Sequence, residues 1–121
     1  MPFAAIGIDT APILGRSDLF SRDGKCQHAF CIDVDREGDV RVLANVEPDR
    51  YWADTMLHEL GHGAYDIGFD GSLSWLLRDC HLTMTEGIAM LMGRLAQEAE
   101  WLREVAGVDA DEAERLDGPL Q

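Results

Sequence analysis

The clearest pattern in the chain is an alternation of apolar and polar residues between Cys26 and Val46. The apolar positions are Phe30, Ile32 and Val34 in a first run, then Val40, Val42, Ala44 and Val46 in a second. A period of two places one face of each run on a core, and a polar stretch with a glycine between two such runs is typical of a turn. The pattern predicts a β-hairpin joined at Arg36, Glu37 and Gly38.

From residue 48 onward the apolar period changes to that of a helix. Pro48 and Asp49 offer a helix start, and Gly68 or Gly71 offers a stop. Between them, apolar residues recur three or four positions apart, at Ala53, Met56, Leu57, Leu60, Ala64 and Ile67. This spacing predicts a first helix with one apolar face.

A second, longer helix is predicted after a connection in which residues 73–78 favour one turn of helix. Thr83 or Thr85 is the candidate capping residue, and Gly107 is the candidate stop. Helical spacing is continued between them by Ile88, Leu91, Met92, Leu95, Ala99, Leu102 and Ala106. The sequence thus predicts one uninterrupted helix over this stretch.

The two ends of the chain differ in their patterns. Residues 1–24 contain several prolines and glycines and show no sustained period, so we expect an irregular N-terminal arm with one short turn near residues 17–20. Asp109 and Glu112 favour a short, capped C-terminal helix that stops at Gly118.

These elements together predict an α+β fold, in which a β-hairpin packs beside two long antiparallel helices and a short C-terminal helix follows. A length of 121 residues suits one domain, so we expect residues 1–121 to form a single domain. An apolar fraction of 46% is ordinary for a globular protein and argues against disordered and fibrous classes.

The charge balance of the chain disfavours some classes of binding partner. The chain has 23 acidic and 10 basic residues, a net charge of -13. Such a chain repels phosphate backbones and anionic lipids, so we expect no nucleic-acid and no membrane partner. The acidity either serves solubility or selects basic and neutral substrates, and the sequence leaves both readings open.

The N-terminal residues and the cysteines indicate the cellular compartment of the protein and the state of its thiols. Residues 1–9 have no basic leader and only a short apolar run, which fits neither a signal peptide nor a spanning helix, so we expect a cytoplasmic protein. Cys26, Cys31 and Cys80 are odd in number and lack CxxC spacing. We therefore expect free thiols and neither a disulfide framework nor a cysteine-zinc site.

Residues 58–62, with the sequence HELGH, lie inside the first predicted helix. Two histidines four positions apart lie on one helix face, so His58 and His62 can bind one metal ion. Glu59 is rotated by about 100° around the helix, in the position of a general base that does not bind the ion. Gly61 lowers helix propensity, which indicates that another segment or a ligand passes close to it.

The third metal ligand has several candidates downstream, which are Asp66, Asp70, Asp79, His81 and Glu86. Glu86 opens a new helix after a connection long enough to reverse the chain direction. Two antiparallel helices can then bring His58, His62 and Glu86 around one tetrahedral ion and leave a fourth position for water. The alternative for Glu86 is an acid that favours the helix dipole.

At this point the residues resemble a known family. The HELGH segment, followed by TEGIA at residues 85–89, is similar to the pattern of gluzincin metallopeptidases of the angiotensin-converting-enzyme-like type and of related bacterial oligopeptidases. Upstream, DGKCQHAF at residues 23–30 resembles the strand on which these enzymes bind substrate. The resemblance covers about residues 18–95.

The resemblance implies one zinc ion held by His58, His62 and Glu86, with Glu59 as base, and an extended peptide paired near His28 and Ala29. From chemistry alone, zinc activates a bound water while the glutamate takes its proton. His28 is then a substrate or oxyanion contact, or else an ordinary strand histidine.

The chain also departs from the family pattern. Family members are several times longer, and the tyrosine and histidine donors that stabilise their transition state come from a region with no counterpart here. Tyr51 and Tyr65 do not match that position. The acid that family members carry one turn after the ligand glutamate is Met90 in this chain, which cannot accept a hydrogen bond from an imidazole.

Two hypotheses of function follow. The first is a minimal zinc peptidase that hydrolyses short peptides by glutamate-assisted attack of a zinc-bound water. The second is a zinc-binding, non-catalytic or partner-dependent part of a larger peptidase, acting as an assembly module. Apolar residues on the helices are either ordinary core or an exposed surface for homo-oligomers, the candidates being Trp75, Leu76, Leu77, Met84, Met90 and Trp101.

Overall fold

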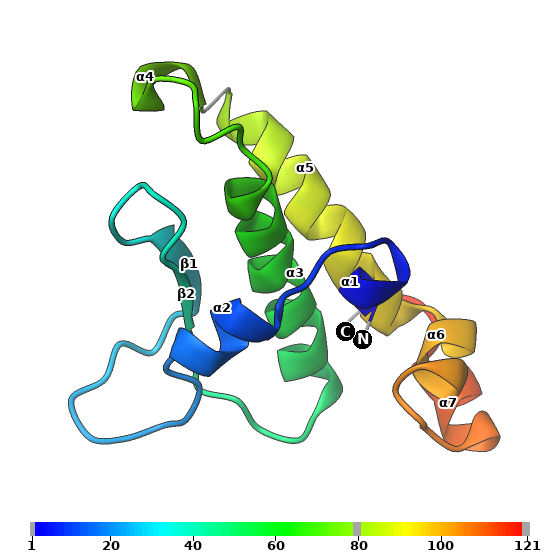
Figure 1. The fold of residues 1–121 in the computed structure, drawn as a ribbon. Helices are drawn as coiled ribbons and strands as arrows, with labels where there is room; N and C mark the ends of the chain where they lie inside the picture. Colours follow the sequence, from blue (N-terminus) through cyan, green and yellow to red (C-terminus); the bar gives the residue numbers. More distant parts are fainter. Residues whose placement is uncertain (1, 79–80, 120–121) are drawn as a thin grey trace.

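A computed structural model describes residues 2–78 and 81–119 of the chain and has the predicted α+β character. The hairpin consists of β1 (Phe30–Asp33) and β2 (Val40–Leu43), and the longest helix is α3 (Arg50–Ile67). Helix α3 is central, because it packs against the hairpin on one side and against α5 (Leu82–Gly93) on the other (Figure 1). Figure 1 shows α3 and α5 running in opposite directions.

The β-hairpin is confirmed, with an antiparallel register that pairs Cys31 with Val42. Val40 and Val42 point into the core and are fully buried. In the first run the expected face is wrong, because Phe30, Ile32 and Val34 are exposed. Cys31, which alternates with them, packs against the core instead. The other edge of β2 is occupied by the segment at Asp18, whose N–H donates to the carbonyl of Val42 and whose carbonyl accepts from the N–H of Ala44. Within the residues that the structure describes, β1 is therefore the strand at the open edge of the sheet.

Helix α3 begins and ends where the sequence predicts. The Asp49 side chain caps its start by accepting the N–H of Trp52 at 2.8 Å, and the N–H of Gly68 donates to the carbonyl of Tyr65 at its end. A Cβ atom built on Gly61 would lie 2.8 Å from the Cα of Ala89. The prediction that another segment passes close to Gly61 is thus confirmed, and that segment is α5.

The second half of the chain differs from the prediction. The expected turn of helix is α4 (Trp75–Arg78), but α5 is capped by the His81 ring, which accepts the N–H of Thr83, and not by Thr83 or Thr85. The uninterrupted helix predicted up to Ala106 is wrong. Three segments replace it, namely α5, the 3₁₀ helix η1 (Arg94–Gln97) and α6 (Ala99–Glu104).

The apolar period does not show where the regular α-helix ends. Gly93 ends α5 pressed against α3, since a Cβ atom built there would lie 2.8 Å from Oδ1 of Asp54. Glu98 then adopts an extended conformation between η1 and α6. The C-terminal helix α7 (Ala110–Leu116) is capped by the Asp109 side chain, as predicted.

The expectation of an irregular N-terminal arm over residues 1–24 is also wrong. This stretch contains two short helices, α1 (Pro2–Ala5) and α2 (Ala11–Arg16). They carry Phe3 and Ile13 into the core, where each side chain is 1% exposed. Proline is favoured in the first turn of a helix, which is where Pro12 stands in α2.

Lys25, the single lysine of the chain, fixes the loop that leads into β1. Its side chain is 1% exposed, and its Nζ donates to the carboxylate of Asp18 at 2.9 Å and to the carbonyls of Phe20 and Ala44. Burying an ammonium group is costly unless its donors are satisfied, and here each N–H has an acceptor. The loop that carries His28 and Ala29 is therefore anchored at Lys25.

Cys26 and Cys31 are free thiols, and Cys80 lies outside the described residues. None of the helices that the structure describes is long and apolar enough to cross a membrane.

Candidate metal centre

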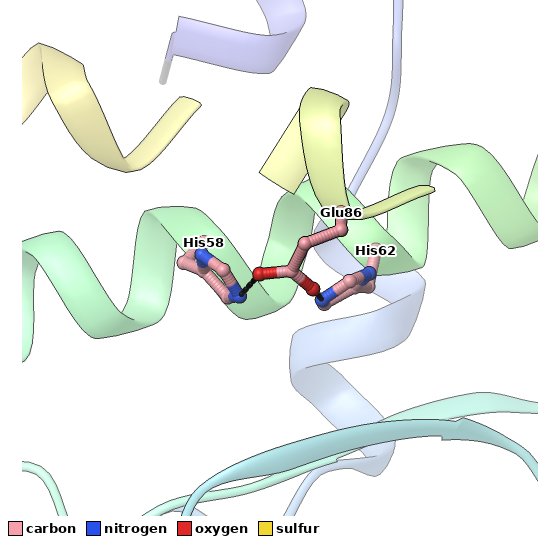
Figure 2. A group of neighbouring side chains, drawn as sticks. All are labelled: His58, His62 and Glu86. Atoms are coloured by element: carbon pink, nitrogen blue, oxygen red, sulfur yellow. Dashed lines mark ion pairs between the residues drawn. The ribbon is translucent and has the colours of Figure 1, made fainter. Parts of the chain in front are cut away.

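Three side chains from two helices converge at one point. His58 and His62 project from α3, and Glu86 projects from α5 so that its carboxylate lies between the two imidazole rings (Figure 2). The Nε2 of His58 lies 3.4 Å from one carboxylate oxygen, and the Nε2 of His62 lies 3.3 Å from the other. Among the described residues, these three form the one group of histidine, cysteine and acidic side chains placed to hold a metal ion.

The donor atoms are close enough to share one ion. One ligand atom from each residue lies within 4.8 Å of the other two. Each imidazole nitrogen lies at ion-pair distance from a different oxygen of the Glu86 carboxylate. The residues present therefore fit a zinc ion, with donors of the types that zinc accepts.

The close packing of α3 on α5 places the third ligand. The histidines stand one turn apart on α3, with Gly61 between them in the sequence. Because Gly61 has no side chain, the backbone of α5 at Ala89 can approach α3 directly. Glu86 is three residues before Ala89, nearly one turn earlier, which brings its carboxylate over the two rings.

His62 is held at both ring nitrogens. Its Nε2 faces Glu86, and its Nδ1 lies 2.7 Å from the hydroxyl oxygen of Thr85. Burial lowers the pKa of His62, and the neighbouring His58 lowers it further, although Glu86 acts in the opposite direction. The neutral imidazole, which is the form that binds a metal, is therefore favoured.

Glu59 lies apart from the three candidate ligands and is 8% exposed. Burial raises the pKa of its carboxyl group, and the negative charge of Glu86 adds to the rise, while His58 and a hydrogen bond from the backbone N–H of Cys31 oppose it. The strand β1 thus holds the Glu59 carboxylate beside the candidate metal centre, outside the group of candidate ligands.

A cavity of about 270 Å³ joins the candidate base to the predicted substrate-binding segment. His28 and Ala29 line it together with His58 and Glu59. The expected strand at these two residues is wrong, because they lie in the loop before β1. Its remaining walls come from Gln27, Tyr51, Trp52, Asp54 and Thr55. His58 belongs both to this cavity and to the ligand group, so all six residues predicted for the site lie in one region.

The other candidates for the third ligand lie elsewhere. Asp66 lines a separate cavity with Asp33, Asp70 accepts hydrogen bonds from Ser72, and His81 caps α5. Asp79 lies outside the described residues. None of the three described alternatives joins the group around His58, His62 and Glu86.

The sequence does not reveal the role of Thr85. It offers Thr85 only as one of two candidate helix caps, with Thr83, but the structure places the Thr85 hydroxyl 2.7 Å from Nδ1 of His62. The sequence signal for this contact is the position of Thr85 immediately before Glu86. The contact with His62 can be inferred from it only when the offset of α5 along α3 is known.

Comparison with protein-family models, curated proteins and solved structures finds no match to this chain. The resemblance to gluzincin peptidases stays a prediction, and function is inferred from the residues of the site and from their geometry.

Proposed function

We propose that this chain is a zinc-dependent peptidase of the gluzincin type that hydrolyses short peptides. The observation that carries the proposal is the convergence of two imidazoles and a carboxylate, with one ligand atom from each within 4.8 Å of the others, next to the buried carboxyl group of Glu59. A purely structural zinc site needs no such carboxyl group and usually fills its fourth position with another cysteine or histidine.

The choice of zinc follows from the donor types. Two imidazole nitrogens and one carboxylate oxygen suit zinc better than magnesium or calcium, which prefer oxygen ligands in larger number. When bound, zinc supplies a Lewis acid that lowers the pKa of water to about 7 and polarises a carbonyl group.

Glu59 is the residue that takes and returns the proton. Its carboxyl group is buried and its pKa is raised, so it accepts a proton more readily than an exposed glutamate. The backbone N–H of Cys31 holds the carboxylate in place. Burial beside the cavity also limits the access of bulk water to this carboxylate.

The open edge of β1 supports extended binding of a peptide. The N–H of Val34 donates to Asp39 across the hairpin, so in an antiparallel ladder the intervening residues direct their N–H and C=O groups to the other edge. This alternation places Cys31 on the open edge, in agreement with its bond to Glu59. Ala29 lies immediately before the ladder, which begins at Phe30. A peptide paired at Ala29 would pass Glu59, with His28 beside it in the same cavity.

The experiment combines metal analysis with hydrolysis of a set of short peptides. Glu59→Gln should retain zinc and lose hydrolysis by at least 10²-fold, which is the usual size of general-base effects. His58→Ala should lose zinc. Glu100→Gln, at an exposed glutamate outside the site, serves as the matched control and should behave like the unaltered chain.

The outcomes of the zinc analysis and the hydrolysis assay distinguish a peptidase from an assembly module. Zinc without hydrolysis in the unaltered chain would reject the peptidase and favour a zinc-binding assembly module or a partner-dependent part of a larger peptidase. The exposed apolar side chains of α4 and α5 favour this second function. A chain that binds no zinc would reject both.

A further inference from the structure

The imidazole of His62 must carry its proton on Nδ1 when Nε2 binds a metal ion. A group that accepts a hydrogen bond from this Nδ1–H fixes the orientation of the ring and makes the imidazole a better metal ligand. In this chain the group in contact with Nδ1 is the Thr85 hydroxyl, at 2.7 Å. We propose that Thr85 is the positioning residue for His62, an inference that rests on the metal site of the proposed function.

The position where a carboxylate would be expected does not serve this role. Met90 stands one turn after Glu86, and 63% of its surface is exposed. A thioether is a poor acceptor for an imidazole N–H. The acceptor therefore stands one residue before the ligand glutamate and not one turn after it.

Helix packing fixes the Thr85 hydroxyl. Thr85 and Ala89 are one turn apart on α5, and Ala89 is fully buried where α5 meets Gly61 of α3. Thr85 is itself partly buried on this face, whereas the adjacent Glu86 is exposed. The branched side chain of threonine also has few rotamers, so the hydroxyl is held towards His62.

A hydroxyl group acts differently from a carboxylate at this position. It can donate or accept a hydrogen bond, whereas a carboxylate only accepts. In the metal-free chain, the Thr85 hydroxyl can donate a hydrogen bond to Nδ1 while Nε2 carries the ring proton and faces Glu86. When Nε2 binds the ion, the ring proton is on Nδ1, and the hydroxyl can accept a hydrogen bond from it. The ring stays oriented in both states, without a second negative charge beside Glu86.

The test measures zinc affinity by competition with a chromogenic chelator, without any activity assay. Thr85→Val should weaken zinc binding about 10–100-fold, as expected for loss of a group that orients a ligand. Thr85→Ser keeps the hydroxyl and should bind within about threefold of the unaltered chain, while Thr85→Ala should be as weak as Thr85→Val.

The same helix offers a matched control. The Thr83 hydroxyl lies 2.7 Å from Nδ1 of His81, which is the same pair of groups outside the metal centre. Thr83→Val should leave zinc affinity unchanged. In the zinc-loaded chain, the His62 ring N–H should give a slowly exchanging proton resonance that Thr85→Ser retains and Thr85→Val loses.

Two results would overturn the inference. If Thr85→Val binds zinc as tightly as the unaltered chain, Thr85 does not position the ligand, although the peptidase proposal stands. If Thr85→Val fails to fold, the comparison of Thr85→Ser with Thr85→Ala decides, and equal affinities reject the role. Absence of zinc from the unaltered chain is a separate result, which rejects the metal site itself.

Discussion

The Cys31 thiol lies among carboxyl groups on the inner side of β1. Burial raises its pKa to about 12, and the negative charges of Asp66, Glu59 and Asp33 contribute to the rise. Its sulfur would lie 3.6 Å from a Cβ atom built on Gly63, which places it against α3. Cys26, by contrast, is exposed in the loop that precedes β1.

These surroundings predict a large difference in thiol reactivity. At pH 8 a thiol with a pKa of about 12 is almost entirely protonated, so Cys31 should react with iodoacetamide about a thousandfold more slowly than an ordinary exposed cysteine such as Cys26. Both rates are measured by mass spectrometry after timed quenching, with cleavage after Phe30 to place Cys26 and Cys31 in separate peptides. Equal rates in the folded chain would contradict the burial of Cys31, whereas equal rates in denaturant are expected.

The predictability of the site differs from residue to residue. His58 and His62 follow from helical geometry alone, because residues four apart share a face. Glu86 follows less directly, since it requires the chain to reverse between α3 and α5. The Thr85 contact depends on the offset of α5 along α3, which the meeting of Gly61 with Ala89 sets.

At the scale of elements, the contact of α3 with α5 can be tested by a pair of glycine substitutions. Gly61→Ala places a methyl group 2.8 Å from a backbone atom of α5 and should lower the free energy of unfolding by about 1–3 kcal/mol. Gly87→Ala meets nothing within 4 Å and should raise it by up to about 1 kcal/mol through helix propensity.

Urea denaturation of the zinc-free chain measures both substitutions without interference from metal binding. A stabilising effect of Gly61→Ala would show that the two helices do not approach as closely as described. Destabilisation by Gly87→Ala would instead show that this side of α5 is covered.

Local signals predict some elements well and others poorly. The hairpin and α3 have strong apolar periods, and α3 and α7 also have aspartate caps, so short-range information locates these elements. It does not place the face of β1, whose apolar residues Phe30 and Ile32 are exposed. The break after Gly93 is not visible because the residues beyond it still bury apolar side chains at helical intervals. The short helices α1 and α2 are stabilised by burying Phe3 and Ile13 in a core that long-range packing creates.

At the scale of the whole molecule, α4 and α5 carry exposed apolar side chains, and Figure 1 shows α4 at one end of the structure with α5 running inward from there. We call these side chains the α4–α5 surface, and they are Trp75, Leu76, Leu77, Leu82, Met84, Met90 and Leu91. Trp101, the remaining candidate for such a surface, is partly buried and packs on the core. Large apolar patches rarely stay uncovered, which favours association with another chain.

The resulting prediction is self-association that increases with salt. The net charge of -13 opposes contact between copies, and salt screens that repulsion. Light scattering should therefore show a weight-average mass that rises with protein and salt concentration. A double substitution of Leu76 and Leu77 by glutamate should keep the chain monomeric.

Val105→Glu is the control for this prediction, because Val105 is an exposed apolar residue outside the α4–α5 surface. It should leave association unchanged. A mass that stays monomeric at millimolar protein concentration and high salt would reject the surface as a site of contact between copies.

The burial of Lys25 has a consequence for chemical labelling. The chain has no other lysine, and the ammonium group of Lys25 lies among oxygen acceptors with 1% of its side chain exposed. Acylation requires a free amine that a reagent can reach, so the folded chain should not be acylated at this residue. Acylation of Lys25 would therefore occur only when the loop before β1 opens. The rate of acylation then measures how often the segment that borders the candidate active site opens.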